Sequence, residues 1–212
     1  MYFFDLDGTL LDSNGIWLDI DIDFLARHGI APVPPEYTDY VTHHNFEDSA
    51  QYTRAYFGLD MTPEEIIATW QDMARDAYAH QLELKPGARD FLSRANADGI
   101  RCALLTSCIP SLCHGALTHH RLYPLLEQVF TTADLGLEKR DPALYRRVAE
   151  LCGELPETCI LFDDSPVYCA AAKEAGWQIY GVADPVFADR ANEMTALCAP
   201  DRFPFSFHSP LV

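Results

Sequence analysis

Basic residues are scarce in this sequence. Its 212 residues include 15 Lys and Arg against 32 Asp and Glu, which gives a net charge of −17. Nucleic acids and anionic membranes are bound by basic surfaces, so neither is expected as a partner. A small anionic substrate would need a few local cations, supplied by Lys, Arg or a bound metal ion.

Other sequence signals are missing as well. No apolar run approaches the length of a membrane span, and only four residues precede Asp5, which leaves no room for a signal peptide. The seven cysteines form no C-x-x-C pair, and Cys102, Cys159 and Cys169 lie in apolar segments, which predicts buried, reduced thiols. Neither a Walker loop nor a G-x-G-x-x-G loop occurs. These absences predict a cytoplasmic protein and disfavour a nucleotide-cofactor enzyme.

The rhythm of the expected elements changes near residue 85. Before it, apolar residues recur at helical spacing, and Thr62-Pro63-Glu64-Glu65 is a typical helix start. After it, short apolar strands alternate with helices, which indicates a parallel sheet. The expected strands are residues 2–4, 100–105, 129–130, 159–162 and 177–182.

We therefore expect two domains in an α/β protein. Residues 1–12 and 85–212 would form the core with its central parallel sheet. Residues 13–84 would form a small all-helical cap, inserted directly after the first strand. The tail, residues 201–212, is expected to be extended and partly tucked against the core, with no assigned role.

Polar side chains end three of the expected strands. Because crossovers between parallel strands are right-handed, all the carboxyl ends lie at one edge of the sheet, where such folds bind their ligands. The side chains expected to meet there are Asp5 and Asp7, Thr106 and Ser107, and Asp163 and Asp164.

Four carboxylates at one edge repel one another unless a cation lies between them. Hard oxygen ligands favour Mg²⁺. Asp5 and Asp164 are expected as direct ligands, Asp163 as a ligand directly or through water, and Asp7 as a ligand through its main-chain carbonyl. The sequence therefore predicts a magnesium site.

The same residue types suit phosphoryl transfer. Thr106 and Ser107 offer a hydroxyl and backbone N–H groups to phosphate oxygens, and Lys139, just ahead of a capped helix, can neutralise both phosphate and nucleophile. Asp5 can attack phosphorus, while Asp7 can protonate the leaving oxygen and later deprotonate water. Positioning and charge compensation would supply most of the catalysis.

These motifs resemble those of the haloacid dehalogenase (HAD) superfamily, in the subgroup with a helical cap after the first strand, such as phosphoglycolate-phosphatase-like and β-phosphoglucomutase-like proteins. The resemblance covers about residues 2–182. In order, the four motifs are Asp5-Leu6-Asp7-Gly8-Thr9, Ala103-Leu104-Leu105-Thr106-Ser107, Lys139, and Asp163-Asp164-Ser165.

The resemblance implies a Rossmann-like core, Mg²⁺ as cofactor, an aspartyl phosphate on Asp5 and a phosphate-binding role for Gly8. Two departures from the family pattern stand out: Arg140 replaces a common Pro after the motif lysine, and Tyr168 is bulky where relatives have small residues. The second acid, Asp7, separates this chain from the dehalogenase and phosphonate-hydrolase branches.

In the expected cap, His43, His44 and Arg54 are candidates for contact with the leaving group, against the plainer interpretation that they are solvated. Four aromatic residues of the expected cap could line a substrate pocket, but most of them are expected to pack the small core of the cap: Trp17, Tyr52, Tyr56 and Trp70. Three aspartates could suggest a second metal ion, but they are expected to form a solvated helix face: Asp19, Asp21 and Asp23.

The sequence thus predicts an Mg²⁺-dependent phosphatase, a phosphoric monoester hydrolase acting on a small phosphorylated metabolite. The alternative is an isomerase that moves phosphate within a sugar phosphate, and a further alternative is a catalytically silent binding module. A monomer or a weak dimer is expected.

Overall fold

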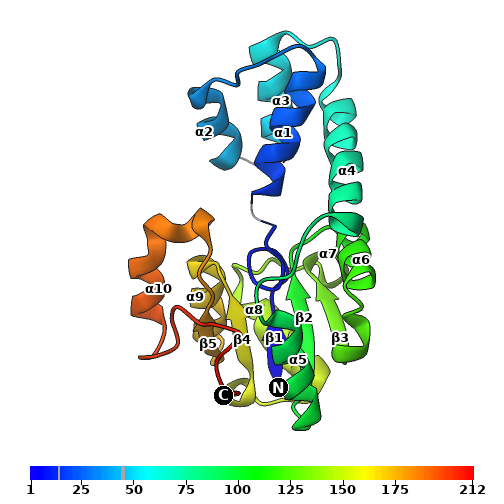
Figure 1. The fold of residues 1–212 in the computed structure, drawn as a ribbon. Coiled ribbons are helices and arrows are strands. Elements are labelled where there is room, and N and C mark those ends of the chain that lie inside the picture. Colours follow the sequence, from blue (N-terminus) through cyan, green and yellow to red (C-terminus); the bar gives the residue numbers. More distant parts are fainter. Residues whose placement is uncertain (14, 44–45) are drawn as a thin grey trace. The chain divides into compact units, whose positions relative to one another are not determined.

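A five-stranded parallel sheet forms the centre of the larger of two units (Figure 1). The computed structural model describes residues 1–13, 15–43 and 46–212. It divides into a core unit, Met1–Asn14 with Leu82–Val212, and a helical unit, Gly15–Gln81.

The strand order is β3-β2-β1-β4-β5, with every neighbouring pair parallel. The first strand in the sequence is therefore the central one, and the residue that follows it, Asp5, emerges in the middle of the carboxyl edge. The predicted strands and the α/β fold class are confirmed. Their bounds are β1 Tyr2–Phe4, β2 Cys102–Thr106, β3 Gln128–Thr131, β4 Ile160–Asp163 and β5 Gln178–Gly181.

Helices connect these strands in the core unit. Asp141 begins one of them as predicted, because its side chain accepts a hydrogen bond from the N–H of Ala143 at 2.8 Å. The last helix, α10, was not predicted from the sequence. The bounds are α5 Ala88–Ala97, α6 Pro110–His119, α7 Thr132–Leu135, α8 Pro142–Cys152, α9 Pro166–Glu174 and α10 Ala191–Leu197.

The sheet is apolar on both faces, as a parallel sheet covered by helices requires. Successive residues of β1 point to opposite faces. Phe3 packs against Trp177, with ring centroids 4.4 Å apart, in a cluster that includes residues of α8 and α9. Phe4 stacks on Phe162 at 4.7 Å and contacts Phe91 of α5.

The C-terminal tail completes the second face. Phe205 and Phe207 are buried, and both rings contact Phe91. Phe205 also pairs with Val182 just beyond β5. The tail is therefore tucked against the sheet, as expected, and its alternating aromatic residues are part of the hydrophobic core.

The helical unit contains α1 Ile16–Arg27, α2 Pro35–His43, α3 Phe46–Phe57 and α4 Pro63–His80. The predicted capping box at the start of α4 is present: the N–H of Glu65 donates to the Thr62 hydroxyl at 3.2 Å, and the N–H of Thr62 donates to the Glu65 carboxylate at 2.8 Å. None of the described helices combines the length and the apolarity that crossing a membrane requires.

One prediction for α1 is wrong. Asp19 and Asp23 are exposed, but Asp21 is buried and accepts a hydrogen bond from the hydroxyl of Tyr37 at 3.0 Å. That hydroxyl also lies 2.7 Å from the hydroxyl of Thr53 in α3. Burial raises the pKa of Asp21 to about 6. The prediction failed because α1 is covered by α4 and also by Tyr37 of α2, so its three aspartates do not share one environment.

Candidate active site

The carboxyl edge of the sheet is the candidate catalytic edge. At its centre a buried lysine is held between two aspartates. Lys139 Nζ donates to Asp5 Oδ1 at 2.7 Å and to Asp163 Oδ2 at 2.6 Å. The three residues lie after β3, after β1 and at the end of β4, so the parallel topology brings them together. Lys139 is 1% exposed, which is rare for a lysine unless its charge is paired.

Opposite charges decide the protonation of this group. Burial by itself lowers the pKa of Lys139, but the carboxylates of Asp163 and Asp5 raise it well above its ordinary value. Burial raises the pKa of Asp163 to about 6 against the opposing effect of Lys139. At neutral pH Lys139 and Asp163 are therefore both ionised. Both carboxylate oxygens of Asp163 accept hydrogen bonds, since its Oδ2 accepts from Lys139 and its Oδ1 accepts from the N–H of Ser165 at 2.8 Å.

Asp164 adds a third carboxylate beside Asp5 and Asp163. Burial first, and then the negative charges of Asp163 and Asp5, raise the pKa of Asp164 well above its ordinary value. Its Oδ1 accepts a hydrogen bond from the Thr9 hydroxyl at 3.2 Å. A buried carboxylate with this excess of negative charge around it favours a cation beside it.

The donor set fits Mg²⁺. One carboxylate oxygen from each of Asp5, Asp163 and Asp164 lies within 4.8 Å of the others. The oxygens are hard donors and few, as Mg²⁺ prefers when it keeps several waters. Since Asp163 already holds Lys139 and Ser165, we expect Asp5 and Asp164 to be the direct ligands.

Asp7, two positions after Asp5, is half-buried. Its Oδ1 accepts a hydrogen bond from the Ser13 hydroxyl at 2.7 Å, and the same hydroxyl lies 3.3 Å from the N–H of Gly8. Gly8 has φ of 73°, a left-handed conformation that suits glycine and turns the chain sharply after Asp7. The thiol of Cys108 also forms a hydrogen bond with the side chain of Asp7. The acid is therefore positioned by neighbours on two loops.

The second motif occupies the same edge. Thr106 is buried at the end of β2, and its Oγ1 accepts the N–H of Cys108 at 3.0 Å, which leaves the hydroxyl proton to donate to a phosphate oxygen. Ser107 is exposed, and its side chain forms a hydrogen bond with that of Tyr168. The centroid of the Tyr168 ring lies 4.8 Å from Lys139 Nζ, so this bulky residue contacts the lysine itself.

Several residues around the site were not singled out from the sequence. Thr9 donates a hydrogen bond to Asp164, and Ser13 donates one to Asp7. Their positions, within and shortly after the Asp5–Thr9 motif, were the sequence signal that could have identified them. Lys85, which is half-buried, donates to the buried Asp184 at 2.7 Å, and the charge of Asp184 also raises the pKa of Asp164, after burial and the charges of Asp163 and Asp5. No sequence pattern connects Lys85 to Asp184, since 99 positions separate them.

The cap candidates belong to the helical unit. Arg54 is exposed on α3 of the helical unit, where it borders a hollow of about 550 Å³ together with Gln51 and Pro63. His44 lies outside the described residues. Arg140 is exposed and forms an ion pair with Glu138 at 2.7 Å. Trp70 is buried as expected, whereas Tyr56 is 40% exposed.

The chain is similar to known hydrolases along nearly its whole length. The model of the haloacid dehalogenase-like hydrolase family matches residues 2–182. Hexitol phosphatase A of Escherichia coli is 28% identical over 197 residues, which cover 91% of this chain and 87% of that protein.

Two solved structures are similar in fold. A HAD-family hydrolase of Deinococcus radiodurans, crystallised with phosphate and sodium, superposes with a TM-score of 0.71 at 25% identity, covering 94% of this chain and 88% of that one. A candidate β-phosphoglucomutase of Thermotoga maritima superposes with a TM-score of 0.83 at 21% identity, covering 94% and 91%.

Proposed function

Because the chain belongs to the haloacid dehalogenase-like hydrolase family, we propose that it is an Mg²⁺-dependent phosphatase acting on a small phosphorylated metabolite. The observation that supports this most strongly is the bridge from Lys139 to Asp5 and Asp163, with Asp164 beside it. The group combines a nucleophile, a fixed cation and a metal-binding pair of carboxylates. Phosphoryl transfer needs little else from a protein.

In the first step Asp5 is the nucleophile. Lys139 holds its Oδ1, while its Oδ2 accepts no hydrogen bond from the described residues. One carboxylate oxygen forms a bond to phosphorus as the bond from phosphorus to the ester oxygen breaks. The charge of Lys139 offsets the negative charge of the phosphoryl group, and the Thr106 hydroxyl donates to one of its oxygens. The product is an aspartyl phosphate on Asp5.

Asp7 transfers the protons. It gives its proton to the leaving ester oxygen, so an alcohol departs in place of an alkoxide. The resulting carboxylate then takes a proton from water, whose oxygen attacks phosphorus and releases Asp5 and inorganic phosphate. Ser13 is a positioning residue in this scheme, because it donates to Asp7 and contacts no reacting atom.

Asp5, Asp164 and the main-chain carbonyl of Asp7 would hold the metal ion. When bound, Mg²⁺ supplies positive charge to the phosphoryl oxygens and relieves the repulsion among the carboxylates. The protein contributes the arrangement of oxygens and the burial that keeps these charges effective.

The helical unit is proposed to act as a cap. Both segments that connect it to the core belong to the catalytic edge: the N–H of Asp12 donates to the carbonyl of Glu83 at 3.0 Å, and the N–H of Lys85 donates to that of Leu10 at 2.8 Å. A unit tethered there can cover bound substrate and exclude water. Arg54 and His44 are proposed, on this basis, as residues that contact the leaving group.

The test is a panel of phosphomonoesters with Mg²⁺, in which phosphate release and sugar-phosphate interconversion are measured together. Phosphate release from at least one ester is expected. Isomerisation without net release would favour the mutase alternative, which shares every catalytic residue. No turnover of any ester, including an aryl phosphate, would contradict an enzymatic role and leave the binding module.

A further inference from the structure

The loops of the catalytic edge carry far more negative than positive charge. They contain eleven Asp and Glu against four Lys and Arg, a net charge of −7. The loops counted are those that follow the strands and the segment returning from the helical unit: residues 5–14, 82–87, 107–109, 132–141, 163–165 and 182–190.

Each of the four cations already has an acidic partner. The pairs are Lys139 with Asp5 and Asp163, Lys85 with Asp184, Arg140 with Glu138, and Arg190 with Glu193. The Arg140 pair is exposed and the Arg190 pair is partly exposed, so both are weak. If either arginine turned to an anionic group of the substrate, the glutamate that it left would become an unpaired negative charge. Lys139 is needed by the transferring phosphate. Among the described residues of these loops, no unshared cation remains for a second anionic group.

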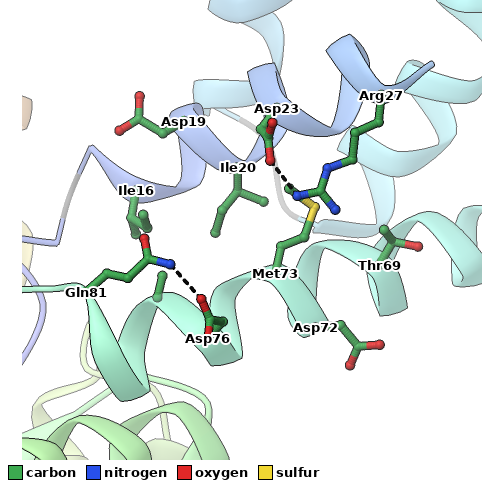
Figure 2. A pocket seen from close by; sticks show the side chains of 11 residues that line it. Ile16, Asp19, Ile20, Asp23, Arg27, Thr69, Asp72, Met73, Asp76 and Gln81 are labelled. Carbon is green, nitrogen blue, oxygen red and sulfur yellow. Dashed lines mark hydrogen bonds and ion pairs between the residues drawn. The ribbon is translucent and has the colours of Figure 1, made fainter. Parts of the chain in front are cut away.

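The helical unit has the same sign. Residues 15–81 contain three Arg and no Lys against twelve Asp and Glu, a net charge of −9. A hollow of about 530 Å³ between α1 and α4 illustrates this composition (Figure 2): Asp19, Asp23, Asp72 and Asp76 border it. Its single basic residue, Arg27, is turned to Asp23 at 2.6 Å.

We infer that the phosphate is the only anionic group of the substrate, and that the rest of the molecule is neutral or cationic. This inference rests on the proposed function and narrows its substrate class. The phosphate dianion would be matched by Mg²⁺ and Lys139, whereas a carboxylate or a second phosphate on the same small molecule would meet a net negative field in which these loops offer it no unshared cation. Fields of this kind change association by about 10–10³-fold.

The test uses two pairs of esters that differ only in the distal group. Sorbitol 6-phosphate is compared with 6-phosphogluconate, and glycerol 3-phosphate with 3-phosphoglycerate; in each pair a neutral hydroxymethyl group replaces a carboxylate. At low ionic strength kcat/KM should be at least about tenfold higher for the neutral member of both pairs, mainly through KM. The ratio should shrink as salt is added.

Equal or better turnover of the carboxylate member in either pair would overturn the inference, and so would a ratio that salt does not change. Where neither member is hydrolysed, their inhibition constants against aryl phosphate hydrolysis give the same comparison at the same site. The proposed function fails separately, by the absence of phosphate release from every ester and from the aryl phosphate.

Discussion

At the scale of single residues, Lys139 is the centre of the site because it compensates two carboxylates that would otherwise face each other in a buried place. Its side chain is 0% exposed, as is that of Asp163. Removing one partner of such a pair leaves buried charge without compensation, which costs about 3–5 kcal/mol. The same lysine is proposed to neutralise the phosphate, so one substitution should affect both stability and turnover.

Lys139→Met should therefore lower the free energy of unfolding by about 3–5 kcal/mol at neutral pH and abolish phosphate release. Urea denaturation and a phosphate-release assay measure the two effects. Lys85→Met is the control: it breaks another lysine–aspartate pair, in which the aspartate is buried and the lysine half-buried, but Lys139 and its partners remain. Turnover by Lys139→Met comparable with that of Lys85→Met would exclude the assigned role.

Asp7→Asn tests proton transfer separately from charge compensation. An amide cannot protonate the leaving oxygen, so kcat/KM for an alkyl phosphate, which covers the steps up to the aspartyl phosphate, should fall by about 10²–10⁴-fold. An aryl phosphate has a better leaving group and should lose less in the first step. The measurement is the ratio of the two losses; an equal loss for both esters would mean that Asp7 does not act as the general acid.

At the scale of elements, the sequence predicted what depends on local pattern and on topology. The strand ends carrying Asp5 and Asp163 could be located because apolar runs stop there, and the parallel arrangement placed them together. The environment of Asp21 could not be predicted, because it depends on Tyr37, which reaches it from another helix. The partner of Lys85 was hidden for the same reason: pairing across 99 positions follows from tertiary structure alone.

The buried Asp21 gives the helical unit a pH-dependent stability. Its folded-state pKa of about 6 lies above the ordinary value of 3.8, so its contribution is complete below 3.8 and is lost as pH rises through about 6. Two pKa units correspond to about 3 kcal/mol. Asp21→Asn should remove this part of the pH dependence and gain stability relative to the natural chain between about pH 4 and pH 7.

Urea denaturation at a series of pH values measures this effect. Asp19→Asn, on the same helix but exposed, is the control and should keep the pH profile of the natural chain. If both variants keep that profile, Asp21 titrates as an ordinary exposed aspartate and the buried contact with Tyr37 does not persist in solution.

At the scale of the whole molecule, a chain with a net charge of −17 concentrates three buried carboxylates at one edge of its sheet. Mg²⁺ should therefore stabilise the folded state. At a hundredfold excess over its dissociation constant the gain is about 2.7 kcal/mol. Thermal or urea unfolding with and without Mg²⁺ measures it, and Asp164→Asn should lose the gain. An equal gain in that variant would place the ion elsewhere.

The proposed transfer of phosphate to Asp5 with the help of Mg²⁺ can be tested by the rate of phosphate release from a phosphomonoester. The natural chain and Asp5→Asn are compared, each with Mg²⁺ and after chelation, with unfolding curves to establish that the variant is folded. The natural chain should release phosphate only with Mg²⁺, and the folded variant should release none. Appreciable release by Asp5→Asn, or release by the natural chain that chelation does not reduce, would contradict the account.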